Sequence, residues 1–179
     1  MSRVPVFKRK RRSARKTFLI FTEGLDESCF LKYLKSLYSI HRNVEINIKK
    51  GKGGSADRLI IQAHKIPGSF NARAVVMDND RGKWEMKKAR EIATSKNIIL
   101  IENTPCLEAV LLMILQKGKD FSVKKSKWCK SEFESRYINH NDREDISEYS
   151  KHFPKKILDK SRSNISSLDT VISLLEGKN

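Results

Sequence analysis

The sequence predicts an α/β fold: a four-stranded parallel sheet flanked by helices, with a C-terminal helical appendage. Two observations lead to this expectation. Short apolar runs of strand length alternate with longer segments whose apolar residues recur at helical spacing. The alternation occurs four times with short connections, and repeated strand–helix units of this kind form parallel sheets that are covered on both faces.

The first strand–helix unit opens at residue 17, where TFLIFT is a continuous apolar run rich in aromatic and branched side chains. Phe30, Leu34 and Leu37 follow at helical spacing and indicate the first helix. Pro105 suits the first turn of the fourth helix, where a missing N–H costs no hydrogen bond. The other strands are expected at 43–50, 72–77 and 97–101, and the other helices at 56–66, 83–96 and 105–117.

The chain divides by composition into three regions. Residues 1–16 are expected to form a flexible basic arm, because KRKRRSARK at 8–16 places seven cations in nine residues and cannot bury itself. Such a block can equally be a nuclear-localisation signal. Residues 17–118 are expected to form the α/β domain, and residues 119–179 a mainly helical C-terminal extension.

The extension has a weaker pattern than the rest of the chain. Trp128, Phe133 and Tyr137 are the expected packing points in its polar first half. SSLDTVISLLEGK at 166–178 predicts an amphipathic helix that ends at Gly177.

The charge balance points to a polyanionic partner. The 179 residues carry a formal net charge of +16, and the eight Lys and Arg of residues 1–16 supply half of this excess. Charge of this sign and size favours nucleic acid first and an anionic membrane surface second. A basic protein without a binding role is the alternative.

The sequence favours a cytoplasmic protein with no membrane partner. No apolar stretch approaches 18 residues, and the first residues lack the apolar core of a signal peptide. The three cysteines show neither the CxxC spacing of a zinc site nor a disulfide framework, which fits a reducing compartment.

Acidic residues follow the expected strands and are predicted to meet at one edge of the sheet. Glu23 follows the first strand, Asp78 and Asp80 end the third in VVMDND, and Glu108 opens the fourth helix. Clustered carboxylates repel one another unless a cation lies between them. Oxygen ligands without nearby Cys or His select Mg²⁺ or Mn²⁺. The alternative is that Asp78 and Asp80 are ordinary turn residues of DNDRG.

Basic residues beside this edge are candidates for contact with nucleic acid. GKGGS at 51–55 lacks the spacing of a P-loop, and a flexible loop with Ser55 as helix N-cap is favoured over a phosphate cradle. Arg81 and Lys83 are candidates for a phosphate clamp, or are solvated loop cations. The remaining nucleic-acid-binding candidates are Lys50 and Lys52, and in the arm Lys8, Arg9, Lys10, Arg11 and Arg12.

Three segments carry a resemblance to the Toprim superfamily, and within it to the RloB-like proteins. FLIFTEGLDESCFLKYL at 18–34 resembles the glutamate–glycine turn after the first Toprim strand. VVMDND at 75–80 resembles the Toprim DxD motif, and NTPCLEAVLLMIL at 103–115 is similar to the Asn-Pro-Cys-Phe-Glu segment of RloB-like proteins. This chain departs from the last pattern by an inserted Thr104 and by Leu107 in place of Phe.

The resemblance covers residues 17–116 and implies a Toprim-like, Rossmann-like sheet with a Mg²⁺-dependent phosphoryl-transfer site. It implies that Glu23 acts as general acid or base, that Asp78 and Asp80 hold the metal with Glu23 beside it, and that Glu108 is a further ligand or orients water. Topoisomerases, primases, nucleases and phage-defence proteins belong to this superfamily. RloB-like proteins are associated with restriction-type defence islands, which implies an antiviral effector with a protein partner from a defence system.

A metal-dependent nuclease acting on RNA or DNA is the function that these features favour. A topoisomerase needs a further tyrosine-bearing domain, and a primase needs more surface than 179 residues offer. One alternative is a non-catalytic module that binds nucleic acid or a partner on a Toprim scaffold, and another is a ribosome- or chromatin-like structural protein. The sequence leaves open the choice of RNA or DNA, the oligomeric state and the trigger of activity.

Overall fold

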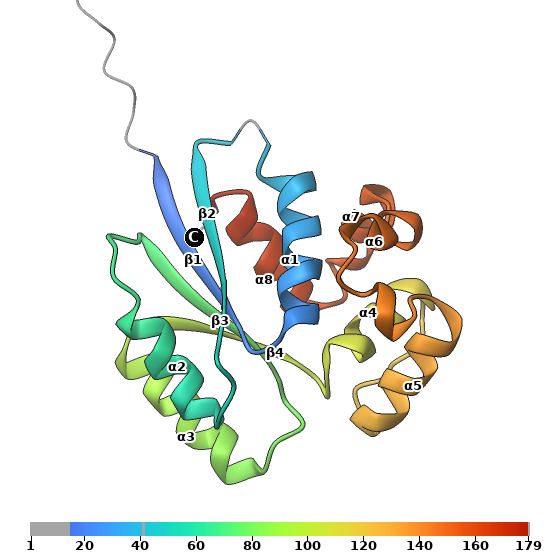
Figure 1. The fold of residues 1–179 in the computed structure, drawn as a ribbon, viewed down its shortest axis with the longest axis horizontal. Helices are drawn as coiled ribbons and strands as arrows, with labels where there is room; N and C mark the ends of the chain where they lie inside the picture. Colours follow the sequence, from blue (N-terminus) through green and yellow to red (C-terminus); the bar gives the residue numbers. More distant parts are fainter. Residues whose placement is uncertain (1–14, 41, 179) are drawn as a thin grey trace, which may run out of the picture.

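The fold is one parallel sheet between two helical layers, as seen in the computed structural model, which describes residues 15–40 and 42–178 (Figure 1). The strand order is β2-β1-β3-β4, and all neighbouring strands run parallel. The predicted α/β class, with a four-stranded parallel sheet flanked by helices, is confirmed for the described residues. The strands are β1 (Lys16–Thr22), β2 (Val44–Lys50), β3 (Ala72–Asp78) and β4 (Ile98–Asn103), and the helices are α1 (Leu25–Tyr38), α2 (Ala56–Lys65), α3 (Lys83–Ser95), α4 (Leu107–Leu115), α5 (Ser126–Arg136), α6 (Ile146–His152), α7 (Lys155–Ser161) and α8 (Ser166–Leu175).

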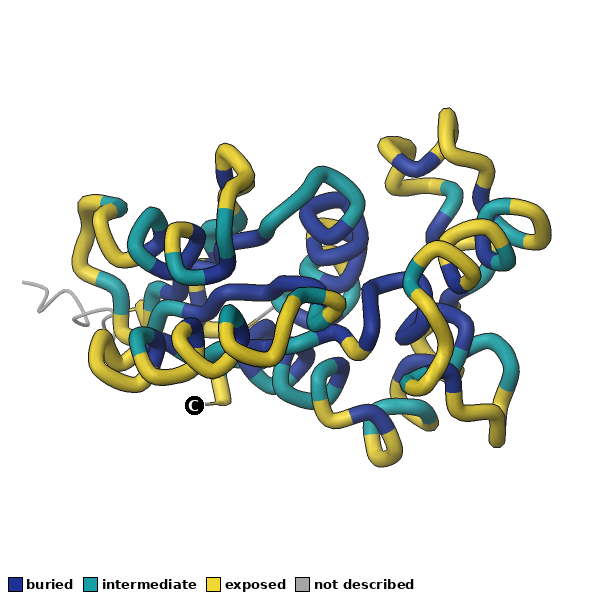
Figure 2. Tube along the Cα trace, turned by 90° about the horizontal axis from the view of Figure 1, so that it is seen from below, coloured by how far each residue is buried: buried dark blue, intermediate teal, exposed yellow. Residues whose placement is uncertain are grey.

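Burial on both faces of the sheet explains why its central strands are continuous apolar runs. Successive side chains of a strand point to opposite faces. Accordingly, Ala74 and Val76 of β3 join one hydrophobic core, and Val75 and Met77 join the other. All four side chains are at most 3% exposed. Figure 2 shows the resulting distribution, with buried residues through the middle of the sheet and exposed residues on the outer turns of the helices.

The two faces are covered by helices from different parts of the chain. Helices α2 and α3 pack against each other over one face, and their Leu59, Ile60 and Met86 fill the core beneath them. Helix α1 covers the other face together with α8, which contacts both α1 and β4 (Figure 1). The helix expected at 166–178 is therefore present as α8, and it completes the sheet's core with Leu168 and Ile172.

Aromatic side chains join α1 to the helices of the C-terminal extension. The Phe30 ring lies 5.6 Å from the rings of both Tyr149 and Phe153, measured between centroids. The Tyr33 hydroxyl donates a hydrogen bond of 2.6 Å to the carbonyl of Phe153. These contacts are buried. The extension is thereby packed directly on the helix that follows the first strand.

The three packing points expected in the extension differ in burial. Phe133 is 1% exposed and takes part in the main core, with Tyr137 beside it at 5.8 Å. Trp128 is 42% exposed and stacks on Phe121 at 5.9 Å, so its ring lies at the surface. Phe133 therefore lies on the inner face of α5, whereas Trp128 lies on a more exposed face of the same helix.

The fourth helix begins later than its sequence predicts. Pro105 was expected in the first turn, but α4 starts at Leu107, and the Thr104–Pro105 peptide bond is cis. The carboxylate of Asp78 accepts a hydrogen bond of 2.9 Å from the Leu107 N–H. A side chain of β3, which is distant in sequence but close in space, thus caps the start of α4. Pro105 lies before the helix rather than in it.

Gly51, directly after β2, lies close to side chain and backbone atoms of α2 and β1. Replacing it by alanine is expected to destabilise the fold. A Cβ at this position would lie 2.8 Å from Leu59 Cδ2 and 3.2 Å from the carbonyl oxygen of Thr22. Overpacking of this kind lowers the free energy of unfolding by about 1–3 kcal/mol. Urea unfolding of Gly51→Ala measures the loss. Gly82→Ala is the control, because a Cβ at Gly82 meets nothing within 4 Å, and an equal loss in both variants contradicts the prediction.

Candidate functional site

A polar cavity of about 260 Å³ opens at the edge of the sheet where β1 and β3 end. Three of its acidic residues come from separate parts of the chain: Glu23 follows β1, Asp78 ends β3, and Glu108 lies in the first turn of α4. The parallel sheet directs its strand ends to the same edge and so brings these residues together. The complete lining is Glu23, Gly24, Leu25, Asp26, Glu27, Asp78, Leu107, Glu108 and Lys130.

Asp78 is the most strongly perturbed of these carboxyl groups. It is 9% exposed, and one oxygen accepts from the Leu107 N–H while the other lies 3.8 Å from Lys130 Nζ. Burial, together with the negative charges of Glu27 and Glu108, raises the pKa of Asp78 to about 8. Lys130 and the Leu107 N–H act in the opposite direction. The free site therefore favours a proton, or another positive charge, on this carboxyl.

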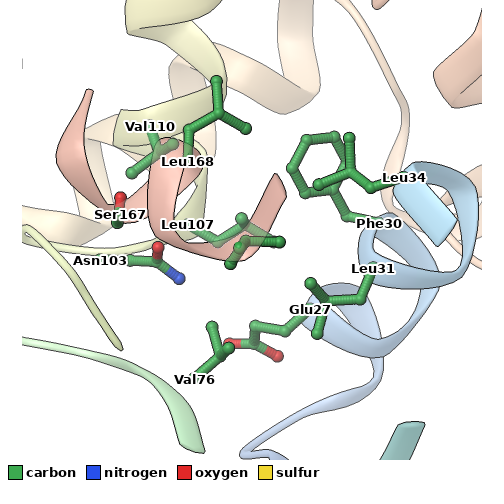
Figure 3. Close-up of a pocket in the computed structure, with 11 residues that line it drawn as sticks. Glu27, Phe30, Leu31, Leu34, Val76, Asn103, Leu107, Val110, Ser167 and Leu168 are labelled. Atoms are coloured by element: carbon green, nitrogen blue, oxygen red, sulfur yellow. The ribbon is translucent and has the colours of Figure 1, made fainter. Parts of the chain in front are cut away.

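Glu27 is a second buried acid of the cavity, and its position was not predicted from the sequence. Its carboxylate accepts a hydrogen bond of 3.0 Å from the Gly24 N–H at the start of α1, which is the glutamate half of a capping box. Burial raises the pKa of Glu27 to about 7. Figure 3 shows the cause, since the Glu27 side chain points toward Val76 in an apolar pocket that is also lined by Leu31. A glutamate three residues after a helix-capping glycine was the signal available in the sequence.

Glu108 is held by an arginine from the C-terminal extension. One of its oxygens accepts a hydrogen bond of 2.8 Å from Arg143 Nη1, and the other is buried without a hydrogen-bond partner. The guanidinium of Arg143, 4% exposed, also pairs with Asp26 and Glu134. Arg143 lies in a polar stretch without periodicity, so the sequence carried no signal that it would be buried.

Glu23 is paired with a cation from the loop after β3. Arg81 donates to Glu23 Oε1 and also to Glu85 at 2.8 Å. The other oxygen of Glu23 is buried and has no hydrogen-bond partner. The sequence leaves open whether Arg81 is a phosphate clamp or a solvated loop cation, and in the structure its guanidinium is shared between two carboxylates.

Asp80 and the predicted basic residues lie outside the cavity lining. Asp80 is exposed in the loop that follows β3, although its charge is one of those that raise the pKa of Lys130 against the effect of burial. Lys50, Lys52 and Lys83 are exposed at the same edge of the sheet. The predicted contacts of Lys8, Arg9, Lys10, Arg11 and Arg12 lie outside the described residues.

The donor set suits a hard divalent cation, although its side chains are not gathered around one point. In residues 15–40 and 42–178, no three His, Cys, Asp or Glu side chains form a group that could hold a metal ion. Glu23 and Glu108 nevertheless each have a buried oxygen without a partner, and Asp78 is destabilised as an anion. Carboxylate oxygens are the ligands of Mg²⁺ and Mn²⁺. Movement of these side chains would be needed to complete such a site.

Comparison of the chain with protein-family models, curated proteins and solved structures gives no match.

In the part of the chain that the structure describes, no helix has the length and apolar character needed to cross a membrane. The three cysteines are free and buried. The function is therefore argued from the site itself.

Proposed function

We propose that this protein is a Toprim-like, metal-dependent nuclease that hydrolyses phosphodiester bonds of RNA or DNA. The observation that supports the proposal best is the meeting of Glu23, Asp78 and Glu108 in one cavity, with a buried unpartnered oxygen on two of them. Repelling carboxylates in a protected cavity destabilise the fold unless a cation compensates them. Each of these three residues belongs to one of the three segments that resemble Toprim and RloB-like motifs.

The proposed roles follow from position. Asp78, with Asp80 moving in from the adjacent loop, would hold Mg²⁺ or Mn²⁺, which supplies polarisation of a phosphate and stabilisation of a leaving oxygen. Glu23 lies at the cavity wall and would transfer a proton. Glu108 is fixed in orientation by Arg143 and would add a ligand or position water. Lys130 faces the cavity and would receive a phosphate oxygen.

Charge supports a nucleic-acid substrate. The net charge of +16 favours polyanions, and Lys50, Lys52 and Lys83 are exposed at the same edge of the sheet as the cavity. A phage-defence setting with a protein partner rests on the RloB-like motifs alone, whereas a cytoplasmic location rests on the apolar pattern and the cysteines of the sequence.

A cleavage assay tests the proposal. Purified protein is incubated with RNA and DNA in Mg²⁺ or Mn²⁺, and Glu23→Gln is expected to cleave about 100-fold more slowly, because proton transfer by a positioned side chain contributes at least this factor. Glu45→Gln is the matched control, since Glu45 is exposed on β2 and does not line the cavity. A protein that binds Mn²⁺ in calorimetry and cleaves neither polymer would overturn the proposal.

A non-catalytic nucleic-acid-binding module is the second candidate, and one observation favours it. Arg81, Arg143 and Lys130 already place positive charge beside Glu23, Glu108 and Asp78 respectively. A cavity neutralised in this way has less need of a metal ion. This candidate predicts salt-sensitive binding of nucleic acid that survives replacement of both Asp78 and Asp80 by alanine.

A further inference from the structure

The tryptophan at the start of α3 is exposed to an unusual degree. Trp84 is 81% exposed, and Lys87 Nζ lies over its ring, 5.5 Å from the centroid. Trp128, by contrast, stacks on Phe121. A flat aromatic ring left in solvent beside lysines is a surface on which another planar group can stack.

Trp84 borders a surface hollow of about 660 Å³ between the first turns of α2 and α3. The two acids of this hollow are neutralised by cations. Asp57 lies 2.6 Å from Lys88 Nζ, and hydrogen bonds from Lys88 and Ser55 lower the pKa of Asp57 to about 2. Glu85 is paired with Arg81 at 2.8 Å and accepts from the Ala56 N–H.

Among the charged side chains that line the hollow, the charge left without a partner of opposite sign is the positive charge of Arg58. Arg58 lines the hollow and is exposed, and Lys83 and Lys87 flank Trp84 in the first turns of α3. Tryptophan and arginine are common at protein–protein interfaces, but lysine is depleted there, whereas lysines beside an aromatic ring are typical of surfaces that follow a nucleic-acid backbone. The composition of this surface therefore favours a polyanion with planar groups over another protein.

Arg81 connects this surface to the candidate site. Its guanidinium binds Glu85, which lines the hollow, and Glu23, which lines the acidic cavity. Glu85 of the hollow and Glu23 of the cavity thus share one arginine, and α2 and α3 both begin near the edge of the sheet where the strands end (Figure 1). In a nucleic-acid strand with one base stacked on Trp84, the phosphates that follow would lie near Arg81 and Lys83, on the way to the cavity.

We propose that Trp84 is a stacking platform for an unpaired base, and that the substrate is consequently single-stranded nucleic acid. The face of a base is available for stacking on a side chain only when it is not covered by its neighbours in a duplex. This inference rests on the proposed function for the role of the cavity, but it concerns binding and can be tested without cleavage.

Binding is measured in the Asp78→Asn background with EDTA, so that no cleavage intervenes. The probes are a 12-nucleotide oligo(U) RNA, oligo(dT) DNA and a mixed-sequence duplex, each labelled for fluorescence anisotropy. Trp84→Ala is expected to weaken single-strand binding about tenfold, as is typical when a stacking aromatic residue is removed, and to leave duplex binding unchanged. Trp84→Phe is expected to restore most of the affinity. An oligo(dU) DNA of the same length differs from oligo(U) RNA only in the ribose 2′-hydroxyl and shows whether that hydroxyl matters.

Val123→Ala is the matched control, because Val123 is an equally exposed apolar side chain, at 85%, on a different surface. In a Trp128→Phe variant, Trp84 is the only tryptophan, and its fluorescence is expected to be quenched by oligo(dT). Equal affinity of Trp84→Ala and its parent for single strands would overturn the inference, as would equal losses for single strands and duplex. Intact single-strand binding in a protein that cleaves nothing would instead overturn only the proposed nuclease.

Discussion

Replacing Arg143 by methionine is expected to lower the free energy of unfolding by about 3–5 kcal/mol, the usual effect of removing one partner from a buried ion pair. The side chain of Arg143 is 5% exposed and carries the positive charge for Glu108, Asp26 and Glu134. Glu108 is itself buried, at 3% exposure, and would lose the cation that is hydrogen-bonded to it, leaving the charge of Lys130 as partial compensation. Urea unfolding followed by circular dichroism measures the change.

Two further variants separate the ion pair from the packing of the arginine. Arg136→Met removes an exposed arginine that forms one i,i+4 pair with Glu132, and it is expected to cost about 0.5 kcal/mol or less. Glu108→Gln in the Arg143→Met background is expected to recover part of the lost stability, because it removes the partly compensated charge. A loss below about 1 kcal/mol in Arg143→Met would contradict the assignment of Arg143 as the counter-charge of the site.

Replacing Asp78 by asparagine is expected to stabilise the metal-free protein at alkaline pH by on the order of 3 kcal/mol, since each unit of pKa shift corresponds to about 1.4 kcal/mol and the repulsion is shared with Glu27. Folding raises the pKa of Asp78 from 3.8 to about 8. A carboxyl with a raised pKa binds a proton on folding, so stability falls as the pH rises between these two values. The gain should therefore be absent near pH 4 and complete above pH 8.

The measurement is thermal unfolding of wild type and Asp78→Asn across this pH range in EDTA. Asparagine keeps an oxygen that can accept the Leu107 N–H, so the cap of α4 is retained. Added Mn²⁺ is expected to stabilise the wild type more as the pH rises, because a metal ligand must lose its proton, and to have little effect on the variant. An equal stability difference at pH 4 and pH 8.5 would contradict the role of the buried charge.

The sheet and its order of elements could be predicted from the sequence because local patterns determine them. The apolar runs ending at Thr22 and Asp78 are buried on both faces, and two-sided burial leaves a continuous apolar signal. The start of α4 could not be predicted in the same way, because it depends on a hydrogen bond that the Leu107 N–H donates to Asp78, a residue distant in sequence.

Within the candidate site, only the residues positioned by the ends of strands could be predicted from the sequence. Glu23, Asp78 and Glu108 follow or end regular elements, and the sheet brings them to one cavity. Lys130 and Arg143 reach the same acids from the extension, where no periodic pattern indicates which side chains turn inward. Their positions depend on the packing of helices against one another, and a single sequence contains no local record of that packing.

The contact of α8 with α1 and β4 has a consequence for how the chain reaches its native state. One face of the sheet is covered only in part, by α1, until α8, far along the polypeptide from β1, has been synthesised and has docked. Contacts between residues so distant in sequence slow folding and leave apolar surface exposed in the meantime. A nascent chain stalled before residue 166 should accordingly bind chaperones that recognise exposed hydrophobic surface.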